Sequence, residues 1–463
     1  MKKLIKNGII VTENTVTNGD LLIDGEEISA LGNFKSSENL YDEVYDADGC
    51  YVFPGLIDPH THMELQQSPK YRSVDDFFTG TKAAAVGGTT MIVDHIAFGP
   101  EGCSLHYSLD VYKELAVKSA IDYSFHGVLQ HVDENILREL DEIITNEGIA
   151  SFKAYSTYGF AMSDLDFYRI LCQMKESGGI LAVHCENDTM TKYLTQKNLE
   201  SGHTAPKYHP LSRPAEAEAE AIDTVLNLAK LAGDAPVYIV HTSSKPGAKR
   251  IRLGRQMGQQ NIFAETCTQY LTLTADKYQE NGDIEGLKYI MAPPLRYKAD
   301  IDELWKSLAD GTIDTVATDH CPFYFETQKK DGMDNFSLAP GGTPGVEERP
   351  RIIFSEGVMK GLISLTDYAK IMSVNAAKIF GMYPKKGALI PGADADVTII
   401  DPAVKQVLSV KNQAGNCDYN TYEGMTVGCG IRYVFSRGNL VCEYGKFTGQ
   451  KGAGKFVYRK RDY

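Results

Sequence analysis

Histidine and aspartate residues follow short apolar segments at several places in this chain, in a pattern typical of metal ligands. His60 and His62 come directly after one such segment, and alternate residues of an extended chain point to the same side, so both imidazoles can reach one ion. His184, His241 and Asp319 each end another apolar segment. A single histidine in such a place is more often an ordinary core or surface residue. Five residues of the types that bind divalent metals favour a metal centre instead.

Lys153 lies near the end of a further apolar segment, residues 151–155. An unpaired ammonium group is costly to bury, and neighbouring dications would repel it. Two interpretations stay open at this point. Lys153 is either a surface residue on a wrongly placed strand, or a modified lysine that carries an anionic metal ligand.

The middle of the chain alternates short apolar strands with amphipathic helices, and these elements must position the candidate ligands. The predicted strands are residues 55–58, 89–95, 121–128, 151–155, 180–184, 237–241, 262–265 and 315–319. The predicted helices between them include residues 75–85, 134–145, 165–177, 215–232, 248–257 and 300–308. Eight strand–helix units predict an α/β fold of the (β/α)8 or TIM barrel type rather than an open sheet. Barrel enzymes carry their sites at the carboxyl ends of the strands, so we expect the ligands at one mouth of the barrel.

Both ends of the chain predict short strands separated by turn signals such as Asn7-Gly8 and Asp24-Gly25. Two β-rich ends around an α/β middle predict one small β-sandwich assembled from both termini. We place this composite domain at residues 1–54 and 388–463, and the barrel at residues 55–387.

Composition limits the function classes. The chain has 463 residues, 43% hydrophobic and 23% charged, and a formal net charge of −14. That charge argues against nucleic acid and anionic membranes as partners, and no apolar stretch is long enough to span a bilayer. The basic segment Lys455–Arg461 is expected to be solvated or to reach a neighbouring subunit. The nine scattered cysteines include no CxxC motif, which favours the reducing cytoplasm.

The motifs around the candidate ligands resemble the dihydropyrimidinase/D-hydantoinase branch of the amidohydrolase superfamily, most of all the bacterial hydantoinases that prefer aryl-substituted rings. The matching segments occur in family order over essentially the whole chain. They are residues 54–63 (PGLIDPHTHM), 75–84 (DDFFTGTKAA), 87–90 (GGTT), 151–153 (SFK), 183–187 (VHCEN), 239–244 (IVHTSS), 293–296 (PPLR), 317–320 (ATDH) and 344–347 (PGVE).

The resemblance implies two divalent metal ions, expected to be zinc, bridged by a carbamate on Lys153. It assigns His60, His62, Lys153 and Asp319 to one metal, and Lys153, His184 and His241 to the other. Two dications would lower the pKa of a shared water and polarise the scissile carbonyl. Asp319 would act as general base and then as general acid toward the leaving ring nitrogen.

A tyrosine five residues after Lys153 completes the implied catalytic set. Tyr158 matches the family tyrosine whose hydroxyl hydrogen-bonds the developing oxyanion, with Tyr155 a weaker candidate for that role. Ala292 and Gly341 stand where the branch commonly has serine and asparagine, at positions that grip the ring's imide edge through backbone groups.

Two loops flank the expected site and are candidates for lids that set specificity. They are residues 63–71 and 156–162. The first contains Met63 and Leu65, the second Phe160 and Met162, and these apolar side chains suit an apolar ring substituent.

The implied reaction is hydrolytic ring opening of a small cyclic amide, a 5-substituted hydantoin (a D-aryl hydantoin above all) or a dihydropyrimidine, to an N-carbamoyl amino acid.

Allantoinase activity stays open as an alternative, because Ala339-Pro340-Gly341-Gly342 is similar to that group. Dihydroorotase is disfavoured, since Met63-Glu64 follow the His-x-His motif where that family has arginine. The collapsin-response mediator proteins share the fold as non-catalytic tetramers without the metal ligands. All six ligand positions are present here, which argues against a scaffold role, and a homotetramer is the assembly that the resemblance implies.

Overall fold

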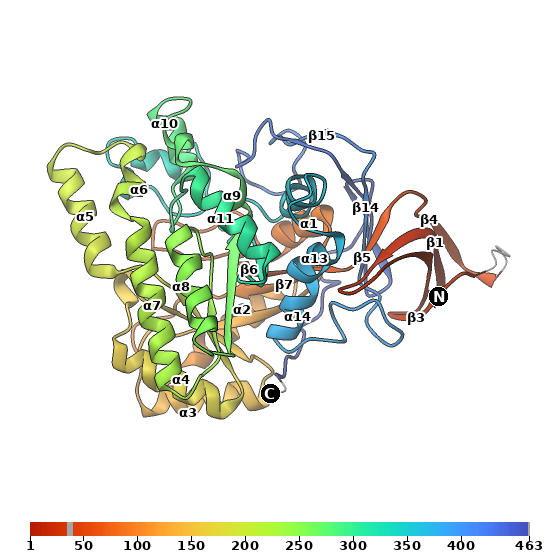
Figure 1. Ribbon diagram of the computed structural model, residues 1–463, viewed down its shortest axis with the longest axis horizontal. Coiled ribbons are helices and arrows are strands. Elements are labelled where there is room, and N and C mark those ends of the chain that lie inside the picture. Colours follow the sequence, from red (N-terminus) through yellow and green to blue (C-terminus); the bar gives the residue numbers. More distant parts are fainter. Residues whose placement is uncertain (35–39, 462–463) are drawn as a thin grey trace.

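The computed structural model describes residues 1–34 and 40–461, which form an α/β barrel beside a smaller β-sheet (Figure 1). The predicted small domain also includes residues 35–39 and 462–463, which lie outside the described residues. No helix within the described residues is both long enough and apolar enough to cross a membrane.

Eight parallel strands form the barrel wall, in the order in which they occur in the chain. They are β6 (Leu56–Thr61), β7 (Thr89–His95), β8 (Asp122–Val128), β9 (Ser151–Tyr155), β10 (Ile180–His184), β11 (Val237–Ile239), β12 (Ile262–Cys267) and β13 (Thr315–Ala317). The chain closes the barrel just past β13, where the Asp319 amide donates to the His60 carbonyl at 3.0 Å and the His62 amide to the His320 carbonyl at 2.9 Å. The predicted barrel and all eight strands are therefore confirmed.

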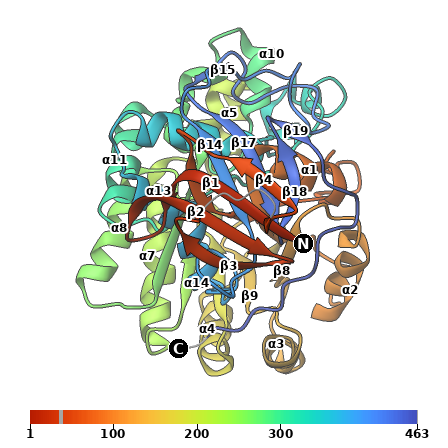
Figure 2. The same ribbon diagram turned by 90° about the vertical axis from the view of Figure 1, so that its right-hand side faces the viewer.

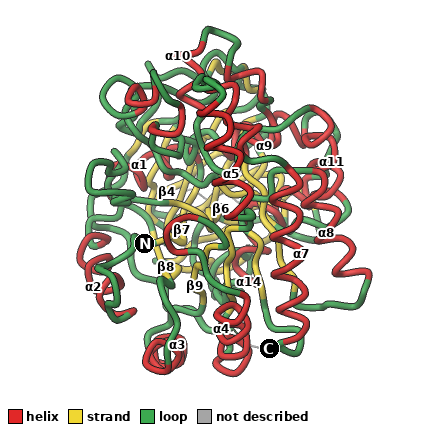
Figure 3. The backbone as a smooth tube through the Cα atoms, turned by 90° about the vertical axis from the view of Figure 1, so that its left-hand side faces the viewer, coloured by secondary structure: helices red, strands yellow, loops and turns green. Residues whose placement is uncertain are grey.

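Helices surround the strands, as the tube in Figure 3 shows. The long helices are α1 (Phe77–Gly87), α2 (Leu105–Ala116), α3 (Glu134–Asn146), α4 (Asp164–Ser177), α5 (Asp188–Glu200), α7 (Ala215–Leu231), α8 (Lys245–Gln256) and α11 (Lys298–Ala309). The short helices are α6 (His209–Ser212), α9 (Thr268–Thr272), α10 (Asp283–Gly286), α12 (Arg349–Ile353), α13 (Leu365–Ala369) and α14 (Asn375–Ile379). Local signals set their ends. Ser163 and Asp166 form a capping box at the start of α4, and Gly178 ends the helix at a φ of 81°.

Strands from both chain ends form one nine-stranded, mostly antiparallel sheet, seen face-on in Figure 2. Its strands are β1 (Lys2–Val11), β2 (Val16–Asp24), β3 (Glu27–Gly32), β4 (Glu43–Asp46), β5 (Tyr51–Pro54), β14 (Val397–Asp401), β17 (Gly430–Ser436), β18 (Asn439–Glu443) and β19 (Lys446–Phe447), with β15 (Gln406–Val407) and β16 (Thr426–Val427) paired separately. The join between the two ends is the antiparallel pair β5–β14. A separate core that includes Ile23, Val52 and Phe435 confirms a small β-domain built from both termini.

The Asn7-Gly8 turn prediction is wrong. Both residues lie inside β1, where a register shift between Ile5 and Gly8 forms a bulge and Asn7 has a φ of 61°. The bulge separates two pairings of β1, with β4 on one side and β5 on the other. Asn7-Gly8 therefore forms a bulge within a strand instead of the turn of a hairpin.

The prediction of a solvated basic tail is wrong for Arg459, whereas contact of the tail with a neighbouring subunit stays a prediction. Residues 455–461 run along the barrel, where the Val457 amide donates to the Tyr123 carbonyl at 2.8 Å. The Arg459 side chain is completely buried, and its guanidinium donates to Ser124, Ser151 and the Phe125 carbonyl. Backbone and hydroxyl acceptors inside the same chain, which no local pattern reveals, satisfy Arg459, and Lys455 pairs with Glu26 at 2.9 Å.

Lys386 joins the two parts of the molecule. Its buried Nζ lies 2.5 Å from Asp122 at the start of β8, and 2.8 and 2.7 Å from Asp394 and Asp396, which precede β14. The three carboxylates lie close enough together to suit a cation. The Lys386 ammonium fills that role, with Arg437 adding a further pair to Asp122 at 3.0 Å.

Candidate active site

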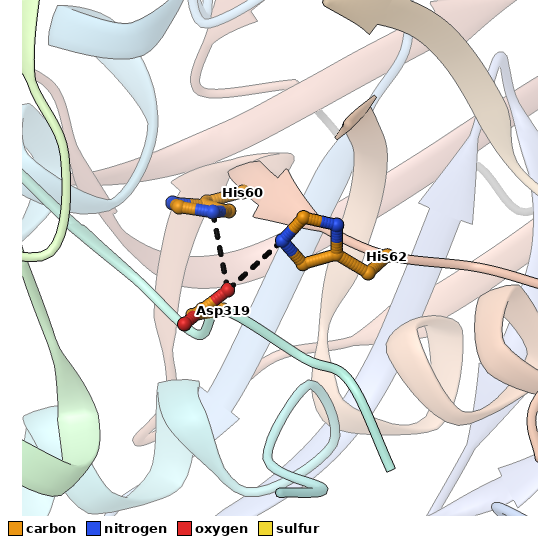
Figure 4. Close-up of side chains that lie close together, drawn as sticks. All are labelled: His60, His62 and Asp319. Carbon is orange, nitrogen blue, oxygen red and sulfur yellow. Dashed lines mark ion pairs between the residues drawn. The ribbon is translucent and has the colours of Figure 1, made fainter. Parts of the chain in front are cut away.

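Two histidines and an aspartate converge at the carboxyl end of the barrel (Figure 4). His60 and His62, from the end of β6, each direct Nε2 at one oxygen of Asp319, at 3.1 and 3.0 Å. Potential ligand atoms of all three residues lie within 4.8 Å of one another, which makes them a group that could hold a metal ion. The alternation of β6 and the closure of the barrel after β13 account for this convergence.

A second group of candidate ligands lies beside the first. The His241 ring centroid is 4.6 Å from that of His184 and 5.4 Å from that of His60. Lys153, on β9, is 1% exposed, and burial lowers the pKa of its ammonium to about 8 in spite of the nearby Asp319 and Glu265 carboxylates. Its strand is real and its side chain faces the cavity, so the surface interpretation of Lys153 is wrong.

Buried carboxylates, which the sequence analysis did not single out, orient the histidines. Nδ1 of His60 donates to Glu265 at 2.6 Å, and the same glutamate accepts the backbone N–H of His241 at 2.9 Å. Nε2 of His184 donates to Glu186 at 2.8 Å, which leaves its Nδ1 for a metal. Such partners fix the ring orientation and tautomer of ligating histidines. The signals in the sequence were the acidic residue at the end of the predicted strand 262–265 and Glu186 within the motif 183–187.

Backbone strain is concentrated at this site. Three residues of the site have positive φ angles: 39° at His241, 54° at Asp319 and 70° at Tyr158. Residues other than glycine rarely adopt this backbone conformation. Such conformations persist where the surrounding structure enforces them, and they often accompany function. Here the strain turns side chains at strand ends toward a common cavity.

The donor set fits a divalent metal centre. Burial, His184 and Lys153 lower the pKa of His241 well below its usual value, so its ring is neutral, the form that binds metals. Burial alone would raise the pKa of Asp319, but His60 and His62 outweigh it and hold that pKa well below normal. Nε2 of His60 is buried and lies 3.1 Å from Asp319 but makes no well-aligned hydrogen bond, as expected of an atom that binds a metal.

All nine predicted site residues line one cavity of about 500 Å³. They are His60, His62, Lys153, Tyr158, His184, His241, Ala292, Asp319 and Gly341. Tyr158 lies in a short 3-10 helix after β9, with its ring 5.1 Å from that of His184. The guanidinium of Arg213 is 5.2 Å from the Tyr158 ring and also pairs with Glu186, so it links the tyrosine to the support of His184.

Only some of the apolar residues of the two predicted lids line the cavity. Leu65 and Phe160 line the cavity, and Phe98, which was not predicted, packs against Phe160 at 4.0 Å between ring centroids. Met63 is completely buried against Gly80 and, like Met162, is not among the lining residues, so that part of the prediction is wrong. Gln67 of the first lid donates to the Gly341 carbonyl at 2.8 Å, which ties this lid to the opposite wall.

The sequence and structure place this chain among known hydrolases. Residues 51–441 match the model of the amidohydrolase family, and the chain belongs to that family. Among curated relatives, the D-phenylhydantoinase of Escherichia coli (strain K12 / DH10B) is 45% identical over 99% of this chain and 98% of its own length.

Solved structures of related enzymes have the same fold as this chain over its whole length. The dihydropyrimidinase from Brevibacillus agri NCHU1002 has a TM-score of 0.96 and 42% identity, with 100% of both chains covered. The L-hydantoinase (dihydropyrimidinase) from Arthrobacter aurescens has a TM-score of 0.90 and 29% identity, with 99% of both chains covered. Because D- and L-hydantoinases both match this fold closely, the fold itself does not determine enantiomer preference.

Proposed function

We propose that this protein is a metal-dependent hydrolase that opens the ring of 5-substituted hydantoins, D-aryl hydantoins above all, or of dihydropyrimidines, to N-carbamoyl amino acids. One observation carries the proposal: the four candidate ligand imidazoles, a buried lysine and an aspartate line a single cavity at the carboxyl end of the barrel. The 45% identity to a D-phenylhydantoinase supports the choice of substrate class.

His60, His62, Lys153 and Asp319 would hold one zinc ion, and Lys153, His184 and His241 a second. Lys153 would bridge them as a carbamate, which forms from a neutral amine and carbon dioxide. Burial lowers the pKa of Lys153 to about 8, so part of the amine is neutral near physiological pH. When bound, the two ions would supply an activated water and polarise the scissile carbonyl.

Asp319 and Tyr158 would carry the proton transfer and the charge stabilisation. The Asp319 carboxyl is ionised, because His60 and His62 hold its pKa below normal, and in this form it would accept the proton of the attacking water and then give it to the leaving ring nitrogen. Tyr158, at the cavity wall, would donate its hydroxyl to the oxyanion that develops on the carbonyl oxygen.

Opposite walls of the cavity would bind the two ends of the substrate. Backbone groups of Ala292 and Gly341 would grip the imide edge of the ring, so the loss of the family's serine and asparagine side chains need not prevent binding. Leu65, Phe98 and Phe160 would receive an apolar ring substituent at the other end.

We also propose a homotetramer in a reducing cytoplasm. The assembly follows from the family resemblance, and sedimentation of the purified protein tests it. The nine cysteines, all free and seven of them buried, support the compartment.

The test is ring opening by the zinc-loaded protein, with D- and L-5-phenylhydantoin, dihydrouracil and allantoin compared side by side. Preferred turnover of phenylhydantoin supports the aryl-hydantoinase assignment, and the ratio of the enantiomers gives the stereochemistry. Preference for dihydrouracil would make the protein a dihydropyrimidinase, and preference for allantoin an allantoinase. No turnover of any ring with two metals bound would contradict the proposed substrate class.

A further inference from the structure

Lys329 is a buried lysine that the reaction above does not use. Its side chain is completely buried and, among the described residues, forms no ion pair with a carboxylate. Nζ donates instead to the backbone carbonyl of Ile290 at 2.6 Å. Burial of this unpaired amine lowers its pKa to about 7, so its presence costs stability, and an apolar side chain of similar volume would be cheaper. Stability alone therefore does not explain the lysine.

The Ile290 carbonyl is a junction between two cavity walls. Besides Lys329 it accepts the backbone N–H of Gly342 at 3.0 Å, so both of its lone pairs are used. Ile290 and Ala292 belong to one wall segment, and Gly341 and Gly342 to the other, and all four line the cavity. The two segments therefore meet at this oxygen, and the contact with Lys329 holds it in place.

The neighbouring contacts hold each segment from its far side. His209 donates Nε2–H to the Met291 carbonyl at 2.7 Å, which fixes the residue next to Ala292. Gly342 has a φ of 140°, and a Cβ there would lie 2.3 Å from the Cys321 carbonyl oxygen, two residues after Asp319. The Cys321 amide also donates to Thr343 at 3.0 Å. The two supported segments meet through the backbone bond from Gly342 to Ile290, and Lys329 is the side chain that holds the acceptor of that bond.

We propose that Lys329 is a positioning residue that holds the Ala292 and Gly341 backbone segments at the spacing needed to grip the substrate ring. This role rests on the proposed function, because those two segments are assigned to the ring's imide edge there. Lys329 does not line the cavity that contains the candidate metal ligands. Its loss would therefore weaken substrate binding and leave the metal centre intact.

The test compares Lys329→Met with Lys330→Met in the zinc-loaded protein. Lys330 is the matched control, because it is the next residue but pairs with Glu326 at the surface. Removal of one buried hydrogen bond predicts a KM for 5-phenylhydantoin raised by roughly tenfold, with kcat changed by less than about threefold. Lys330→Met should leave both constants unchanged, and both variants should bind the same amount of zinc as the parent protein.

Amide hydrogen exchange gives a readout that needs no turnover. The Gly342 N–H should exchange faster in Lys329→Met than in the parent protein, because its acceptor loses the partner that holds it in place. Lys329→Gln, whose amide can still donate toward Ile290, should give intermediate KM and exchange values, and it replaces the methionine variant if that one does not fold.

The outcomes separate this role from the proposed function. If the parent protein opens none of the rings, the proposed function fails, and exchange at Gly342 still tests the junction. Unchanged KM and unchanged exchange in Lys329→Met would overturn the positioning role. A loss of zinc, or a fall in kcat at constant KM, would overturn it as well, since either would mean that Lys329 supports the metal centre.

Discussion

Glu265 accepts a hydrogen bond from Nδ1 of His60 at 2.6 Å, and this contact directs the opposite nitrogen of the ring toward Asp319. The glutamate lies on β12 and the histidine on β6, so the two residues are 205 positions apart in the chain. The same carboxylate accepts the His241 amide and the Tyr238 hydroxyl. One buried side chain thereby orients candidate ligands of both proposed metals.

We expect Glu265→Gln to weaken zinc binding by about 10- to 100-fold while the protein stays folded, because supporting carboxylates of ligating histidines have effects of this size. Zinc retained against a competing chelator measures the change. Glu285→Gln, which alters a surface pair with Lys288, is the control and should retain zinc normally. Equal zinc affinity in the two variants would contradict the orienting role.

Asp319→Asn should retain the fold and much of the zinc but lose turnover by about 10²- to 10⁴-fold, the range associated with loss of a general acid–base group. Thermal unfolding, zinc content and single-turnover ring opening measure the three properties together. A variant with substantial activity would remove Asp319 from the proton-transfer step.

Lys153→Ala should lose zinc and activity together, because the lysine is proposed to bridge both ions. Short-chain carboxylic acids that mimic a carbamate should restore part of both, since the truncated side chain leaves space for them in the cavity. Zinc analysis with and without added acid is the measurement. Normal binding of two zinc ions by the unrescued variant would show that the bridging assignment is wrong.

Lys386→Met should lower the free energy of unfolding by about 3–5 kcal/mol, because it removes the one buried cation that three buried carboxylates share. Asp122, Asp394 and Asp396 all lie within 2.8 Å of the ammonium that is lost. Lys385→Met is the matched control: this neighbour is half-exposed, so its pairs contribute about 1 kcal/mol or less. Denaturant unfolding of the two variants should separate them clearly.

Lys329 predicts a pH-dependent contribution to stability. Its pKa is about 7 in the folded protein against an ordinary value of 10.5, so between these values the unfolded chain binds the extra proton. The folded state is therefore favoured increasingly as the pH rises from 7 toward 10. The stability of the parent protein relative to Lys329→Met should increase over that interval and level off below pH 7. A flat difference would contradict the depressed pKa, and Lys330→Met supplies the flat reference.

Local patterns were enough to predict the barrel and its candidate ligands. Strands of a parallel barrel are short apolar runs between amphipathic helices, and each ligand ends or follows such a run. The i and i+2 spacing of His60 and His62 needs no knowledge of the fold. The helix α2 escaped prediction, although Leu105, Leu109, Tyr112 and Ala116 form a buried helical stripe.

The errors concern contacts that depend on distant parts of the chain. Glu265 reaches His60 because β12 and β6 lie close together once the barrel has closed, and no local sequence pattern encodes that closure. Arg459 is basic in a basic segment, and only the three acceptors around it make burial possible. Met63 sits in a predicted lid, but the neighbouring Gly80 leaves space for it in the core.

β5 and β14 are neighbours in the small sheet, although the whole barrel is translated between them. Each barrel strand can pair with the one made just before it, so the barrel wall can form while synthesis continues. β5 has no such partner on one side, and its edge remains open until residues 397–401 leave the ribosome. The small sheet is therefore completed only after the whole barrel has been translated, and until then the edge of β5 that β14 covers stays exposed.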